Sequence, residues 1–217
     1  SMHLIALILF CTNGLLNAQT AKRYITVEHF TNTLCSNCAA GNPQLFSTLN
    51  NNPGEIHHLS IHSEVPYAAC LFYQHNTAGN NFRKNLYGVN STPTTYTNGL
   101  VRGVGGANLL PQSRVDQLIG QTSPLRIQVS ETINGNVLNV QVAVKSFGTV
   151  NNPNLRLFVA IAEKEILYNA PNGEMDHYNV FRTMLPDNTG KPFTPAPVGL
   201  VSNHSFAVPL GPAWQTS

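Results

Sequence analysis

Cys35 and Cys38 are separated by two residues in the segment TNTLCSNCAAGNP, which runs from Thr31 to Pro43. Two cysteines at this spacing can exchange disulfides, bind half of a metal site or form a small structural disulfide. In an exchange reaction, a thiolate attacks a disulfide and forms a mixed disulfide, which a second thiol can resolve. The spacing allows Cys38 to reach Cys35 within one helical turn, so function depends on which role the pair has.

The segments around the pair favour exchange. Residues 23–31 are rich in β-branched and aromatic side chains, which predicts a strand that leads into Cys35. After Cys38, Leu45 and Leu49 are among apolar residues at helical spacing. Cys35 is therefore expected at a helix N-terminus, where free N–H groups and the helix dipole favour a thiolate.

A second feature of the expected site is Pro93, in the segment NSTPTTY before a further predicted strand. Residues 23–121 predict the element order β-α-β-α-β-β-α, which is an α/β layer structure. In that arrangement the loop before Pro93 faces the cysteine pair. A cis Thr92–Pro93 bond would present the Thr92 backbone to an extended substrate, since only X–Pro bonds are cis at modest cost.

The pattern changes at Ser123–Pro124. Two alternating runs surround Asn134–Gly135, which predicts a hairpin, and short strands separated by Pro, Gly and Asn follow. We therefore expect an α/β domain over 20–122 and an all-β, immunoglobulin-like sandwich over 124–217. The last residues, AWQTS, resemble an unfinished strand, so the sandwich is expected to be truncated at its C-terminus.

The N-terminal segment HLIALILF is apolar but too short to span a bilayer, and the small residue Ala18 follows it. We predict a signal peptide over 1–18, an exported protein and no transmembrane span in the mature chain. Charged residues make up only 10% of the chain, and the formal net charge is +2. This composition lacks the basic character of a nucleic-acid-binding protein.

Cys35-Ser36-Asn37-Cys38, Pro43 and Thr92–Pro93 resemble the corresponding features of the thioredoxin fold. Together with the segments EHFTNTLCSNC, FRKNLYGVNSTPTTYTNG and HYNVFRTMLP, they make the chain similar to the Omp28-related family of Bacteroidetes. Members of this family are exported thioredoxin-like proteins with an added β-sandwich.

The resemblance implies that Cys35 is the nucleophile, that Cys38 resolves the mixed disulfide and that Thr92–Pro93 orients the substrate. It also implies that a buried acid helps to move the proton of the resolving cysteine. Glu28 is the candidate for that acid, and the alternative is a solvated strand residue. The expected partners are protein thiols or disulfides, or a redox partner protein, and the expected location is the periplasm, the outer membrane or the cell surface.

Two other roles of the pair remain open at this stage. A metal site would need further ligands from the residues His29, His57, His58, His62 or Cys70, and no second C-x-x-C or suitably spaced histidine pair completes it. We therefore predict no metal and no cofactor. Alternatively, the pair is an inert disulfide in a surface binding or adhesion protein. Cys70 is expected to be a small buried apolar residue, although it could also trap a mixed disulfide.

Overall fold

The computed structural model describes residues 20–214. The expected signal peptide and the last three residues lie outside this range. In chain order, the elements are β1 (Ala21–Lys22), β2 (Ile25–Thr31), α1 (Ser36–Asn51), β3 (Ile56–His62), α2 (Leu71–Gln74), α3 (Thr77–Leu86), β4 (Thr94–Thr97), β5 (Val101–Val104), the 3₁₀ turn η1 (Gly106–Asn108), α4 (Gln112–Leu118), β6 (Thr122–Ser123), β7 (Leu125–Asn134), β8 (Val137–Ser146), β9 (Arg156–Leu157), β10 (Val159–Leu167), β11 (Asp176–Leu185), β12 (Lys191–Pro192) and β13 (Val201–Pro209).

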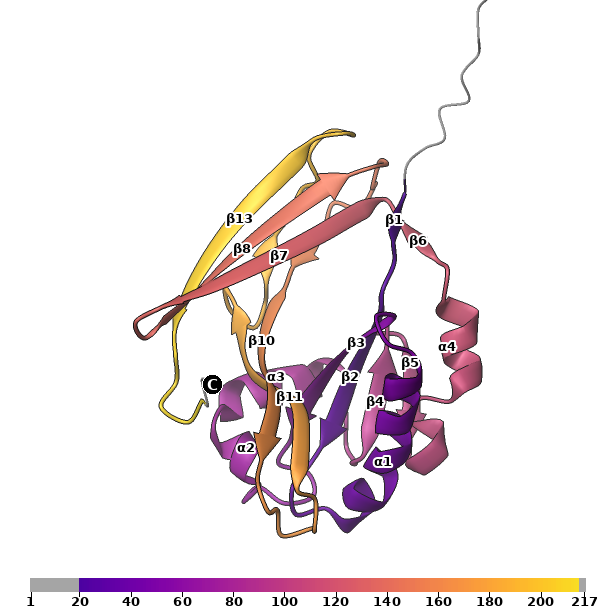
Figure 1. Cartoon of the computed structure of the whole chain (residues 1–217), viewed down its shortest axis with the longest axis vertical. Coiled ribbons are helices and arrows are strands. Elements are labelled where there is room, and N and C mark those ends of the chain that lie inside the picture. Colours follow the sequence, from indigo (N-terminus) through magenta and orange to yellow (C-terminus); the bar gives the residue numbers. More distant parts are fainter. Residues whose placement is uncertain (1–19, 215–217) are drawn as a thin grey trace, which may run out of the picture.

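The largest layer is a six-stranded sheet with the order β10-β11-β3-β2-β4-β5 (Figure 1). β2 pairs with β3 in parallel and with β4 in antiparallel orientation, and β4 and β5 form a hairpin. The element order expected for residues 23–121 is observed, with α2 as an additional short helix. β2 lies near the middle of this sheet, and its last residue, Thr31, is four positions before Cys35.

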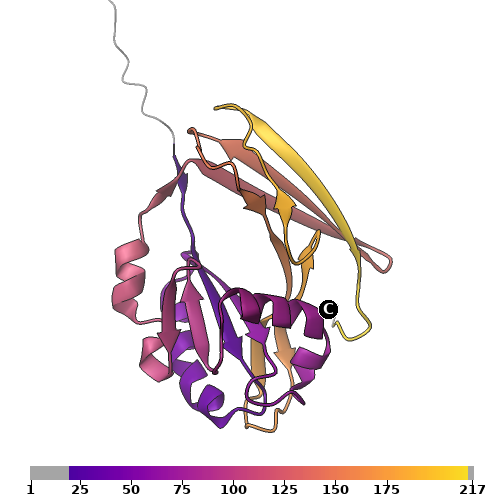
Figure 2. The same ribbon diagram turned by 180° about the vertical axis from the view of Figure 1, so that it is seen from behind.

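Helices cover both faces of this sheet, as the two opposite views in Figures 1 and 2 show. Successive side chains of a strand point to opposite faces. Ile25 and Val27 of β2 accordingly pack with Leu45 of α1 and Val115 of α4. On the other face, Phe30 joins a core cluster that lies on the side of α3. The sheet therefore holds the start of α1, and with it the cysteine pair, against the end of β2.

A second, three-stranded sheet has the order β13-β8-β7 and arches over the ends of β10 and β11 (Figure 1). β7 and β8 form the hairpin expected around Asn134–Gly135, and Gly135 has a φ of 59°. One face of β8 buries the residues Leu138, Val140, Val142 and Val144 against Leu157, Val159, Leu185 and Phe193. Ala213 lies in a turn and Trp214 follows it outside any strand, where the sequence predicted a strand.

β10 and β11 connect the two parts of the molecule. β11 pairs with β3 in parallel through Val180 and Ser60, so the large sheet continues across the sequence boundary expected at residues 122–124. Phe181 of β11 packs in the same core cluster as Phe30 of β2. The alternating pattern of this segment predicts a strand, but it carries no information on the strand's partner. As a result, the tip of the β10–β11 hairpin reaches the neighbourhood of the cysteine pair.

Within residues 20–214, no helix is both long enough and apolar enough to cross a bilayer.

Candidate functional site

Cys35 and Cys38 are free thiols at the start of α1. Cys35 is the N-cap residue, in extended conformation, and its Sγ accepts a hydrogen bond of 3.1 Å from the backbone N–H of Cys38. The helix begins at Ser36, so Cys38 already lies in its first turn. Cys35 is 3% exposed, and Cys38 is fully buried. The expected strand-to-helix position of the pair is confirmed.

The environment separates the pKa values of the two thiols. The pKa of Cys35 is lowered to about 6, mainly because the Cys38 side chain donates a hydrogen bond to it. Burial opposes this shift, and hydrogen bonds from Thr92 and from the backbone of Cys38 and Asn37 support it. The pKa of Cys38 is strongly raised by the same hydrogen bond and by burial. Near pH 7 the pair therefore carries its negative charge on Cys35 and its proton on Cys38.

Thr92 and Pro93 lie beside the pair, as expected. The Thr92–Pro93 peptide bond is cis. The carbonyl oxygen of Thr92 is 3.7 Å from Cys35 Sγ, and its hydroxyl oxygen is 3.6 Å from the same sulfur. A Cβ atom on Gly41 of α1 would be 3.3 Å from Pro93 Cγ and 3.1 Å from Gly106 N. Glycine at this position therefore lets α1 pack closely against the loop that contains Pro93.

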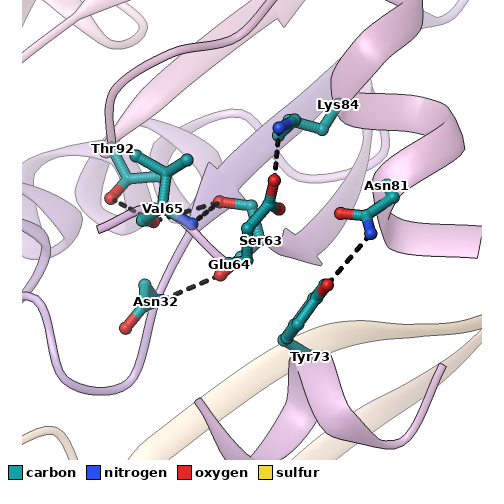
Figure 3. Close-up of polar contacts among 8 residues, drawn as sticks. All are labelled: Asn32, Ser63, Glu64, Val65, Tyr73, Asn81, Lys84 and Thr92. Atoms are coloured by element: carbon teal, nitrogen blue, oxygen red, sulfur yellow. Dashed lines mark hydrogen bonds and ion pairs between the residues drawn. The ribbon is translucent and has the colours of Figure 1, made fainter. Parts of the chain in front are cut away.

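A third loop, residues 63–67, forms hydrogen bonds both with the segment before Cys35 and with Thr92 (Figure 3). Asn32 Nδ2 donates 2.8 Å hydrogen bonds to the carbonyl oxygens of Ser63 and Tyr67. Ser63 Oγ and Thr92 Oγ1 each donate a hydrogen bond of 3.1 Å to the carbonyl oxygen of Val65. The sequence interpretation missed this loop. Its signal was the Val65–Pro66 bond, which is also cis.

Side chains of the helices hold the same loop from outside. Lys84 of α3 forms an ion pair with Glu64, and Asn81 Nδ2 donates a 2.9 Å hydrogen bond to the Tyr73 hydroxyl of α2 (Figure 3). These contacts link the loop to α3 and α3 to α2. The surroundings of Cys35 are thus built from three loops and are supported by two helices.

The tip of the β10–β11 hairpin is a fourth contributor that sequence reasoning missed. The backbone N–H of Asn172 donates to Thr33 O at 3.1 Å, and its side-chain amide donates to Cys35 O at 3.1 Å. Glu174 Oε1 accepts a 2.7 Å hydrogen bond from Asn42 Nδ2 of α1. The hairpin therefore binds both the loop before Cys35 and the first turns of α1. The Asn172–Gly173 pair indicates a turn in the sequence, but not where that turn docks.

Glu28 does not lie with the cysteines. It points to the face of the sheet that α3 covers, because it alternates with Val27 along β2. There it forms an ion pair of 2.5 Å with Arg83 and accepts a hydrogen bond from the Tyr87 hydroxyl. Burial and the Glu28 carboxylate raise the pKa of Tyr87. The side chains of Glu28 and Arg83 are only 16% and 8% exposed. Glu28 is therefore neither near Cys38 nor a solvated strand residue.

The remaining sequence candidates lie apart from the thiols' immediate contacts. Cys70 is fully buried, and its Sγ accepts hydrogen bonds from the N–H and hydroxyl of Thr33 at 3.4 and 3.3 Å. This arrangement agrees with a structural role. His29 and His58 contact each other at 3.4 Å between ring nitrogens. Across residues 20–214, no three His, Cys, Asp or Glu side chains are arranged to hold a metal ion.

Comparison with known proteins shows similarity at the level of structure. No model of a known protein family and no curated protein matches the sequence. HBP35 of Porphyromonas gingivalis superposes with a TM-score of 0.71 and 14% identity, over 88% of this chain and 66% of that chain. A protein from Agrobacterium tumefaciens, solved by a structural genomics consortium, gives a TM-score of 0.53 and 19% identity over 87% and 80%. At these identities the likeness shows a shared fold and nothing about activity.

Proposed function

We propose that this chain is an exported thiol–disulfide oxidoreductase, built as a thioredoxin-like α/β layer with an added immunoglobulin-like β-sandwich. The observation that carries the proposal is the position of Cys35 Sγ at the N-cap of α1. There it accepts the N–H of Cys38, and its pKa is lowered to about 6. A thiol with that pKa is about 90% thiolate at pH 7, and the thiolate is the attacking species in exchange.

The reaction has two steps. In the first, the Cys35 thiolate attacks one sulfur of a substrate disulfide, forms a mixed disulfide and releases the other substrate sulfur as a thiolate, which takes a proton from solvent. In the second, Cys38 loses its proton and attacks Cys35 Sγ. The substrate is released with both sulfurs reduced, and a Cys35–Cys38 disulfide forms. The reverse sequence oxidises a dithiol substrate.

Thr92 is proposed to orient the substrate. Its carbonyl oxygen lies next to Cys35 Sγ, and its hydroxyl is held by the carbonyl of Val65. An extended polypeptide that approaches Cys35 would meet this backbone segment, so protein disulfides are the proposed substrates. We also propose that the chain is related to the Omp28-related proteins of Bacteroidetes and is located in the periplasm, at the outer membrane or at the cell surface. The shared fold with a protein of Porphyromonas gingivalis, which belongs to the Bacteroidetes, supports this relationship.

One observation favours a second function, which is a surface binding or adhesion protein with an inert cysteine pair. Cys35 is only 3% exposed, so a substrate disulfide has little room to reach its sulfur unless the adjoining loops separate. Under this alternative the Cys35–Cys38 disulfide would be structural, with a reduction potential below about −300 mV.

The two functions are separated by an insulin reduction assay with the folded protein and dithiothreitol as reductant. The oxidoreductase predicts turnover by the wild type, none by Cys35→Ser and full turnover by Cys70→Ser, because Cys70 is buried against Thr33. Equal rates for the wild type and Cys35→Ser would contradict the proposal. A Cys35–Cys38 disulfide too stable for glutathione to reduce would support the binding or adhesion function instead.

A further inference from the structure

A small polar cavity lies between α1, the central sheet and the β10–β11 hairpin. Its volume is about 10 Å3, and its lining comes from β2, β3, α1 and the β10–β11 hairpin. The lining residues that matter here are Thr31, Asn42, His29, His62 and Glu174. Such a volume is at the lower limit for one water molecule.

Buried polar atoms line this cavity. His62 Nδ1 has no hydrogen-bond partner, and His29 Nε2 and Asn42 Oδ1 make no hydrogen bond of normal geometry, although Asn42 is close enough to His29 to raise its pKa. The three side chains are 0%, 3% and 2% exposed for His29, His62 and Asn42. Buried polar groups are rarely left without a hydrogen bond. The pKa of His29 is lowered to about 4 and that of His62 is lowered well below its usual value, in both cases mainly by burial. Both imidazoles are therefore neutral near pH 7, and neither readily accepts a proton.

Thr31 lies between Cys38 and this cavity: it lines the cavity, and it acts on the pKa of the Cys38 thiol by lowering it, against the larger effects of Cys35 and burial. Thr31 Oγ1 accepts a 3.0 Å hydrogen bond from Asn42 Nδ2, and the same amide nitrogen donates a 2.7 Å bond to Glu174 Oε1. Asn42 thus holds the Thr31 hydroxyl and the Glu174 carboxylate close together. Glu174 is partly exposed, so it borders both the cavity and solvent.

From this arrangement we infer that Glu174, on the hairpin contributed by the later part of the chain, accepts the proton of Cys38 during resolution of the mixed disulfide. The inference rests on the proposed oxidoreductase function and extends it to a residue outside the α/β region. Cys38 is fully buried and its pKa is raised, so its thiol needs a nearby acceptor before it can attack.

The proton balance is as follows. The thiol proton of Cys38 passes through the hydroxyl of Thr31, with one water molecule in the cavity as the bridge to the Glu174 carboxylate. The Cys38 sulfur forms a bond with Cys35 Sγ as the bond between Cys35 Sγ and the substrate sulfur breaks, and the substrate leaves as a thiolate. Glu174, now protonated, returns the proton to solvent or to that thiolate.

The experiment uses stopped-flow mixing of the reduced protein with Ellman's disulfide. Release of the first thionitrobenzoate reports attack by Cys35, and release of the second reports resolution by Cys38. For Glu174→Gln we expect the second phase to slow by about 100-fold, the lower end of what a positioned proton acceptor contributes. The matched control is Glu131→Gln, an exposed carboxylate on β7, which should change neither phase.

The pH profile of the second phase shows whether Glu174→Gln removes a proton acceptor or only removes structural support for the site. The titratable groups that line the cavity with Glu174 are His29, His62, Asp176, His177 and Tyr178. In the wild type the second phase should be nearly independent of pH around neutrality, because Glu174 accepts the proton in place of hydroxide. In Glu174→Gln it should rise with hydroxide concentration, and Glu174→Asp should restore the flat profile.

Each outcome of this experiment is decisive. A second phase in Glu174→Gln that is as fast as in the wild type, or that is slower with an unchanged pH profile, would overturn the inference while leaving the oxidoreductase function intact. Absence of both phases in the wild type would overturn both.

Discussion

The buried histidines make the protein sensitive to acid, and His29 and His62 give the clearest case. Burial lowers the pKa of His29 from 6.5 to about 4 and lowers that of His62 well below 6.5. The unfolded chain therefore binds more protons than the folded protein below about pH 6.5. Their stabilising effect is complete above that value and is lost as the pH falls towards the folded-state pKa.

The loss of stability can be calculated from the pH range between the unfolded-state pKa and the folded-state pKa. Within it, each pH unit removes about 1.4 kcal/mol per histidine. Between about pH 7 and about pH 5, the titration of His29 lowers the free energy of unfolding by about 2 kcal/mol. The titration of His62 adds to this loss in the same direction. The pKa of His58 is also lowered well below its usual value, mainly by burial and then by the neighbouring His29, so its titration acts in the same direction. Since domains are stable by only about 5–15 kcal/mol, the loss is a large fraction.

Urea unfolding followed by circular dichroism at the two pH values measures this loss. With a slope of about 2–3 kcal/mol per molar urea, the titration of His29 alone should lower the midpoint by about 0.7–1 M at the lower pH, and the titration of His62 should lower it further. The double variant His29→Gln/His62→Gln should show a much smaller shift, whereas His57→Gln should behave as the wild type because His57 is exposed. A midpoint that is the same at both pH values, or a shift that the double variant retains, would refute this reasoning.

Two further variants test the packing of the sheet. A Cβ atom at Gly103 would lie 2.4 Å from the carbonyl oxygens of residues 108 and 109, so Gly103→Ala should cost about 3 kcal/mol or more. Gly148→Ala, whose nearest neighbour is a side-chain atom at 3.3 Å, is the control in thermal unfolding, and equal melting temperatures would contradict the close contact. Arg83→Met leaves the Glu28 carboxylate partly buried and unpaired and should cost about 3 kcal/mol. In urea titrations, the double variant Arg83→Met/Glu28→Gln should recover part of this loss of stability. Strictly additive effects of the two substitutions would argue against an interaction between Arg83 and Glu28.

The local features of the site could be predicted from the sequence. The strand before Cys35 and the helix after it follow from side-chain periodicity, and the proline marks Thr92–Pro93 as a bond that can be cis at modest cost. These are properties of short segments. They depend on turn chemistry and on helix and strand periods, which neighbouring residues determine.

The contacts between distant segments could not be predicted in this way. Asn172 and Glu174 reach the site only because β11 adds to the large sheet beside β3, and strand alternation does not specify that pairing. The family resemblance made Glu28 a candidate for the buried acid, with a solvated strand residue as the alternative. Whether a strand residue faces one layer or the other depends on the register of the whole strand, and Glu28 faces α3. A shift of one residue changes the face, so the sequence could not decide between these two roles.

The central claim is that the fold makes Cys35 a thiolate near neutral pH. It is tested most directly by the pH dependence of Cys35 alkylation with iodoacetamide in the reduced full-length protein, read by mass spectrometry of the peptide that contains Cys35. We predict a rate that rises with a midpoint of about pH 6. A midpoint near 9.0, the ordinary value of the group, would contradict the account.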